Sequence, residues 1–133
     1  MLTDEIKKKL IQAAHLAEQQ AYAAYSNYAV GAALLTKEGE IITGCNIENA
    51  VFPLTLCAER VAIFKAVSES KMEFQAIAVV TRNGGTPCGS CRQVMREFSK
   101  DLPILIANEE EELVLETTLQ SLLPYSFGPE DIA

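Results

Sequence analysis

Hydrophobic and polar residues follow two different periods along the chain, and together they predict helices interleaved with strands. Helices are expected at residues 3–22, 57–70, 88–98 and 118–123. Apolar runs of strand length are found at residues 28–35, from Ile41 onward, and at residues 74–80, 103–107 and 113–115. Five strands that alternate with helices in this order predict an α/β fold, with a mixed sheet covered by helices.

Several residues mark where these elements begin and end. Thr3 suits the N-cap of the first helix. The two acidic residues that follow it are stabilised by the partial positive charge of a helix N-terminus. The polar segment 37–40 contains a glycine and predicts a turn that joins the first two strands into a hairpin. Pro87 precedes the second central helix, and Pro124 ends the last one.

Composition narrows the class of protein. The chain has 133 residues, of which 49% are hydrophobic and 22% charged, so we expect a single domain over residues 1–133. The formal net charge of −7 disfavours nucleic acid as a partner, because a negative chain repels phosphate backbones. No apolar run reaches membrane-spanning length, and we expect a cytoplasmic protein. In a reducing compartment, cysteines are more often ligands or catalysts than disulfides.

Two short motifs carry the chemistry, Cys57-Ala58-Glu59 and Pro87-Cys88-Gly89-Ser90-Cys91, and each begins a predicted helix. Three thiolates can bind zinc and leave a fourth position for water, which is the arrangement of a catalytic site. Cys88 and Cys91 are three residues apart, so one helical turn can present both sulfurs to one ion. Helix N-termini also lower thiol pKa values and so favour the ligand form.

Glu59 and Arg60 follow the first of these cysteines closely. Glu59 is near enough to exchange protons with water on the metal, which is general acid–base catalysis. Three thiolates on a dication leave one excess negative charge, which a nearby positive group must compensate. We expect Arg60 to do so by donating a hydrogen bond to a ligand sulfur.

Other interpretations of the cysteines remain open at this point. The Cys-x-x-Cys pair alone is also typical of a structural zinc site or of a thiol redox protein. A structural site needs a fourth protein ligand, which Cys45 or His15 could supply. His15 is more simply a helix histidine, and Cys45 a small hydrophobic residue at a strand end.

With these motifs in place, the chain resembles the small, homotetrameric class of zinc-dependent cytidine deaminases from end to end. The resemblance rests on five segments, Tyr25–Leu34, Gly44–Ala50, Cys57–Arg60, Pro87–Gln93 and Leu122–Asp131. It implies a three-layer fold and one zinc ion per subunit. It also implies hydrolysis of cytidine and 2′-deoxycytidine to uridine and 2′-deoxyuridine with release of ammonia, as in pyrimidine salvage.

The resemblance also implies a role for particular residues. Zinc would be held by Cys57, Cys88 and Cys91, and protons would be moved by Glu59. The nucleoside would be bound by Tyr28, Asn46, Glu48, Ala58 and Phe127. Within that set, the amide and the carboxylate would bind the sugar hydroxyls, and the tyrosine would pack on the pyrimidine ring. The C-terminal phenylalanine would reach into the active site of a neighbour in a homotetramer with shared sites.

The chain departs from the family pattern at three positions. Tyr28 stands where phenylalanine is more common, so its hydroxyl needs a partner. Phe52 and Ala24 replace a frequent tyrosine and a frequent proline. Two rivals within the superfamily are a deaminase of another aminopyrimidine nucleoside and one that acts on RNA. A non-catalytic zinc-binding module is a third alternative.

Overall fold

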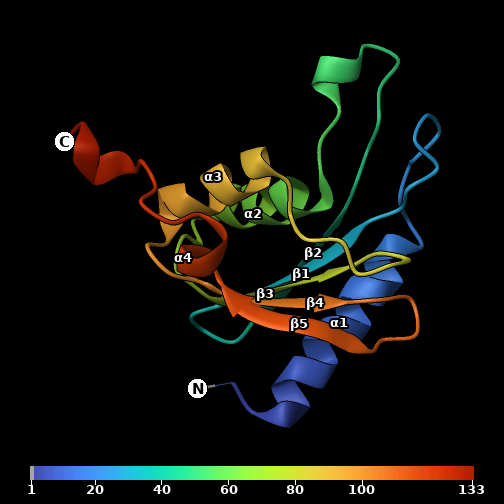
Figure 1. The fold of residues 1–133 in the computed structure, drawn as a ribbon, viewed down its shortest axis with the longest axis horizontal. Helices are drawn as coiled ribbons and strands as arrows, with labels where there is room; N and C mark the ends of the chain where they lie inside the picture. The colour runs from blue at the N-terminus through green and yellow to red at the C-terminus, as the bar shows by residue number, and fades with distance from the viewer. Residues whose placement is uncertain (1) are drawn as a thin grey trace.

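The computed structural model describes residues 2–133, which form one five-stranded sheet with helices on both faces (Figure 1). The helices are α1 (Asp4–Glu18), α2 (Ala58–Ser68), α3 (Gly89–Phe98) and α4 (Leu119–Leu122), with 3-10 turns η1 (Phe52–Leu54) and η2 (Pro129–Asp131). The strands are β1 (Gly31–Thr36), β2 (Ile41–Cys45), β3 (Phe74–Val80), β4 (Pro103–Ala107) and β5 (Leu113–Thr118).

The sheet is mixed and has the strand order β2-β1-β3-β4-β5. Only β3 and β4 pair in parallel, because α3 forms the crossover between them, and the other neighbours are antiparallel. Figure 1 shows α1 on one side of the sheet and α2, α3 and α4 on the other. The predicted α/β fold with three layers is therefore confirmed.

The two faces of the sheet have separate cores, and β3 shows how the sequence builds both. Ala76, Ala78 and Val80 pack with α1, whereas Ile77 and Val79 face α2 and α3. Successive side chains of a strand point to opposite faces. A strand covered on both sides must therefore be apolar where it is covered, as residues 76–80 of β3 are.

Three predicted boundaries were wrong by three residues or more, and tertiary contacts explain them. The last strand runs to Thr118 and not to residue 115, because it pairs with β4 as far as Pro103. The first helix ends at Glu18 and not at residue 22, because the backbone N–H of Tyr22 donates to Asn46 instead. The first strand begins at Gly31 and not at residue 28, because the Asn46 side chain takes the backbone groups of residues 28 and 30. None of these partners could be assigned from local spacing.

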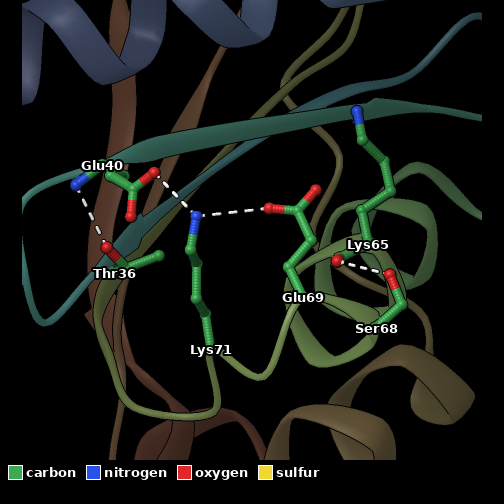
Figure 2. Close-up of polar contacts among 6 residues, drawn as sticks. All are labelled: Thr36, Glu40, Lys65, Ser68, Glu69 and Lys71. Atoms are coloured by element: carbon green, nitrogen blue, oxygen red, sulfur yellow. Dashed lines mark hydrogen bonds and ion pairs between the residues drawn. The ribbon is translucent and has the colours of Figure 1, made fainter.

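The far end of α2 is joined to the β1–β2 turn by polar contacts (Figure 2). The Lys71 ammonium lies 2.7 Å from a carboxylate oxygen of Glu40 and 3.2 Å from one of Glu69. The Glu40 backbone N–H also donates to the Thr36 hydroxyl at 3.0 Å. Across residues 2–133, no helix is both long and apolar enough to cross a membrane.

Close packing of α2 on β2 depends on Gly44. A Cβ at this position would lie 2.5 Å from the Ala58 carbonyl oxygen and 2.6 Å from the Ala62 nitrogen. Both atoms belong to helix backbone and cannot move aside alone. The absence of a side chain at Gly44 therefore sets how closely the first turn of α2 approaches the sheet.

We expect Gly44→Ala to lower the free energy of unfolding by about 2 kcal/mol or more, because the added methyl overpacks two backbones. Urea denaturation of the zinc-loaded protein measures this change. Gly89→Ala is the matched control, since a Cβ there meets nothing within 4 Å. Equal stability of the two variants would show that α2 can shift without cost.

Candidate active site

Three cysteine sulfurs meet where α2 and α3 begin. Cys57 is the N-cap of α2, Cys88 is the N-cap of α3, and Cys91 lies fully buried in the first turn of α3. Their Sγ atoms all lie within 4.8 Å of one another, with 4.0 Å between Cys57 and Cys88 and 3.5 Å between Cys88 and Cys91. The partial positive charges of two helix N-termini therefore converge on one group of thiols.

This sulfur cluster fits a zinc ion. Sulfur ligands about 2.3 Å from a tetrahedral zinc lie about 3.8 Å apart, which matches the spacing of the cluster. Among residues 2–133, no fourth His, Cys, Asp or Glu ligand joins the group. Cys45 and His15 are thus not part of it, and a closed four-ligand structural site is disfavoured.

Arg60 lies against the cluster from the first turn of α2. Its guanidinium donates a hydrogen bond to Cys57 Sγ at 3.3 Å and to the Thr55 carbonyl at 3.5 Å. Hydrogen bonds, first from Cys91 and then from Arg60, lower the pKa of Cys57 to about 5. The bond to Cys57 and burial raise the pKa of Cys91. Protein groups alone thus favour the thiolate at Cys57 and disfavour it at Cys91, and a bound divalent cation would supply the charge that lets the ligand sulfurs ionise.

Glu59 is nearly excluded from solvent, with 4% of its surface exposed, and it lines the same cavity as Cys57 and Cys88. Burial, reinforced by the nearby Cys57 thiolate, raises the pKa of Glu59 to about 7. A carboxyl group with a pKa near neutrality can both accept and donate a proton at physiological pH. The arrangement suits transfer of protons beside a metal.

The site gathers at one edge of the sheet because of strand register. Gly31, at the start of β1, pairs with Cys45 at the end of β2 and with Val80 at the end of β3. The segments that precede β1 and follow β2 and β3 therefore emerge side by side. They carry Tyr28, Asn46 and the loop that leads to the zinc cysteines of α3.

The resulting cavity has a volume of about 280 Å³. Its lining includes Glu59 with two of the clustered cysteines, Cys57 and Cys88, and the apolar residues Val30 and Val79. Asn46 and Glu48 lie in its wall, together with Ser26, Thr55 and Thr81. The lining contributed by the described residues contains no lysine or arginine.

Asn46 and Glu48 are held firmly in this wall. Asn46 accepts from the Val30 N–H and donates to the Tyr28 carbonyl, both at 2.9 Å. Glu48 accepts backbone hydrogen bonds from Tyr25 and Ser26, and hydrogen bonds from Ser26 lower its pKa. The Glu48 carboxylate is therefore kept ionised.

Tyr28 has the partner that its hydroxyl requires. The hydroxyl donates to Asn83 Oδ1 at 2.6 Å, and the Arg82 guanidinium lies 4.9 Å from the ring centroid. Both partners belong to the loop between β3 and α3, whose residues Gly85 and Thr86 also line the cavity. The tyrosine thus replaces phenylalanine without an unpaired hydroxyl.

Two residues expected at the substrate do not line the cavity in this chain. The Ala58 side chain is fully buried in the core. Phe127 is 57% exposed, and its carbonyl accepts a hydrogen bond from the Gln93 side chain. Conversely, Ser26, Thr55 and Thr81 line the cavity but were not assigned from sequence, because an isolated hydroxyl residue carries no distinctive spacing.

An α/β fold that places a sulfur cluster and a buried carboxyl at two helix N-termini defines a zinc-dependent hydrolase. A family model described as "Cytidine and deoxycytidylate deaminase zinc-binding region" matches residues 4–106. A cytidine deaminase of Sporosarcina psychrophila is 46% identical over 129 residues, covering 95% of this chain and 94% of that protein. The chain belongs to the cytidine and deoxycytidylate deaminase family, as the resemblance in the sequence predicted.

Solved structures agree with this assignment. The crystal structure of cytidine deaminase from Burkholderia pseudomallei matches with a TM-score of 0.86 and 44% identity, covering 95% of this chain and all of that one. That of cytidine deaminase from Mycobacterium tuberculosis matches with a TM-score of 0.81 and 38% identity, covering 96% and 99%. The family and the sulfur cluster together assign one zinc ion to each subunit.

We expect Cys88→Ala to lose zinc, because two sulfurs and water hold the ion far more weakly than three thiolates. Elemental analysis of the purified protein gives zinc per subunit. Cys45→Ala is the matched control and keeps its zinc, since Cys45 lies outside the cluster. Full zinc occupancy in Cys88→Ala would contradict this ligand set.

Proposed function

We propose that this chain hydrolyses cytidine and 2′-deoxycytidine to uridine and 2′-deoxyuridine, with release of ammonia from C4. The observation that carries the proposal is the buried Glu59 carboxyl, which lines one cavity with Cys57 and Cys88. Similar proteins named cytidine deaminase support the substrate. A cavity in which a buried carboxyl lies beside a metal site suits hydrolysis of an aminopyrimidine.

A neutral nucleoside suits this cavity better than a nucleotide. Its lining from the described residues carries the carboxylates of Glu48 and Glu59 but no cation. A phosphate group would therefore meet negative charge without a partner, which is costly in a partly closed site. The volume of about 280 Å³ also fits a small ligand.

Glu59 moves the protons of the reaction in this proposal. When bound, zinc acts as a Lewis acid and makes water a nucleophile near neutral pH. Glu59 accepts a proton from the attacking water and passes it to N3 of the pyrimidine, while the water oxygen bonds to C4. It then takes the remaining proton from the new C4 hydroxyl and delivers it to the amino group. The C4–N bond breaks as the C4=O bond forms, and ammonia leaves. The pKa of about 7 suits both directions of transfer.

Other residues hold the substrate in place. Asn46 and Glu48 bind the sugar hydroxyls, since a fixed amide and a carboxylate can donate to and accept from them. The ring of Tyr28 packs beside the pyrimidine. Arg60 acts on the metal by holding the Cys57 sulfur.

The active assembly is a homotetramer with shared sites in this proposal. Figure 1 shows the segment that carries η1 and the C-terminal segment projecting from the body of the chain. Phe52, Leu54 and Phe127 on these segments are 68%, 63% and 57% exposed. Apolar projections of this kind need a partner surface, and a second copy supplies one. Phe127 then completes a neighbour's site, which explains its absence from its own.

A cytoplasmic role in pyrimidine salvage follows from the same proposal. The four cysteines are all unpaired, which suits a reducing compartment. A nucleoside is also the form of pyrimidine that salvage recovers.

We expect Glu59→Gln to keep its zinc and its fold but to lose about 10²-fold or more in kcat, because an amide cannot carry the protons. Ammonia release from cytidine, measured with zinc content and melting temperature, tests this. Glu69→Gln, a surface change at the opposite end of α2, is the matched control and keeps wild-type activity. Normal turnover by Glu59→Gln would remove the residue from the mechanism.

The same assay separates the rival functions. A non-catalytic zinc module releases no ammonia from any nucleoside, and a thiol redox protein stays active after zinc is chelated. A panel of aminopyrimidine nucleosides distinguishes cytidine from other substrates of the family. Cytidine turnover that stops with chelation and returns with zinc supports the proposal.

We expect Phe52→Glu to dissociate the assembly and to reduce activity, because a charge replaces an apolar contact between subunits. Light scattering should give four times the chain mass of 14.5 kDa for the wild type and a smaller multiple for the variant. Glu38→Gln, at the exposed hairpin turn, is the control. A fully active monomeric wild type would overturn the shared site.

A further inference from the structure

The hydroxyl of Ser26 lies between two parts of the cavity wall, and the mechanism above does not use it. Ser26 belongs to the segment between α1 and β1, and it lines the cavity as well as an outer groove beside Tyr25 and Phe52. Its hydroxyl donates to Glu48 Oε2 and accepts from the Tyr28 backbone N–H at 3.0 Å. One hydroxyl therefore joins the residue proposed for the sugar to the residue proposed for the base.

The other contacts of Glu48 show what this hydroxyl adds. Oε1 accepts the backbone N–H groups of Tyr25 at 2.8 Å and of Ser26 at 2.9 Å. Among the partners that residues 2–133 offer, Oε2 has, besides the Ser26 hydroxyl, only the Asn46 amide at 3.4 Å, which is long for a hydrogen bond. The backbone thus fixes one carboxylate oxygen, and the Ser26 side chain fixes the other.

Loss of the hydroxyl would leave the carboxylate held at a single oxygen. The terminal torsion of glutamate is broad, so the group could turn about the Oε1 contacts. The Tyr28 N–H would also lose its partner, which loosens the segment that enters β1. Both effects fall on binding of the nucleoside, since neither touches Glu59 or the sulfur cluster.

We propose that Ser26 is a positioning residue. Its hydroxyl orients the Glu48 carboxylate toward the sugar and holds the backbone of Tyr28 in place beside it. This inference rests on the proposed function, in which Glu48 binds sugar hydroxyls. A contact that serves the bound substrate and the transition state alike changes KM and leaves kcat in place. Ser26 therefore acts on affinity for the sugar and not on the chemical step.

The test compares Ser26→Ala, Ser26→Thr and the wild type on cytidine and on 2′,3′-dideoxycytidine, which lacks both ring hydroxyls. Ser26→Ala should raise KM for cytidine roughly tenfold with kcat little changed, as for a lost bond to a charged group. Its KM for the dideoxy substrate should rise less, because that substrate has no ring hydroxyls for Glu48 to bind and only the support of Tyr28 is lost. Ser26→Thr, which keeps the hydroxyl, should restore cytidine binding.

Ser68→Ala is the matched control for a lost serine hydroxyl. That hydroxyl donates to the Lys65 carbonyl at 2.7 Å near the far end of α2 (Figure 2), and its removal should leave both KM values unchanged. If Ser26→Ala does not fold, Ser26→Cys replaces it, because the thiol keeps most of the volume but is a weak donor.

The outcomes separate this inference from the function on which it rests. A KM that rises equally for both substrates, or an unchanged KM for cytidine, overturns the role of Ser26 while the deaminase proposal stands. A wild type that deaminates neither nucleoside overturns both. A KM that rises more for cytidine than for the dideoxy substrate, with rescue by threonine, supports the positioning role.

Discussion

Three thiolates around one divalent cation leave an excess negative charge, and the whole site is built to stabilise it. The N-termini of α2 and α3 converge on the sulfurs and bring partial positive charge. Arg60 adds a full charge and a hydrogen bond to Cys57. Burial, and to a lesser extent the negative charge of Cys57, raise the pKa of Glu59, so the sulfur ligand also affects the group that moves protons.

The sheet makes this convergence possible because the strand register brings several loops to the same side of the sheet. The ends of β2 and β3 and the start of β1 lie side by side, so segments distant in sequence line one cavity. Gly44 lets α2 approach closely enough to place Cys57 and Glu59 there. A small shift of α2 against the sheet would therefore displace Cys57 and Glu59, and with them the metal site.

The polar wall of the cavity is held in place differently from the sulfur cluster. Asn46, Glu48 and Tyr28 come from irregular segments, and each is fixed by hydrogen bonds to the others or to nearby backbone. Such segments have no ladder to hold them, so side-chain bonds replace it. This is also why Ser26 was missed from sequence: its importance lies in two partners that only the folded chain brings together.

The sequence by itself determined the fold class, the zinc cysteines and the position of Glu59, because these depend on local periodicity and on ligands close together along the chain. It placed the end of α1, the start of β1 and the end of β5 wrongly, and it assigned Ala58 to the substrate although that side chain is buried in the core. Tertiary structure alone decided the strand register and the hydrogen-bond partners. Those contacts join residues far apart in sequence, and no local pattern records which distant group will satisfy a given donor.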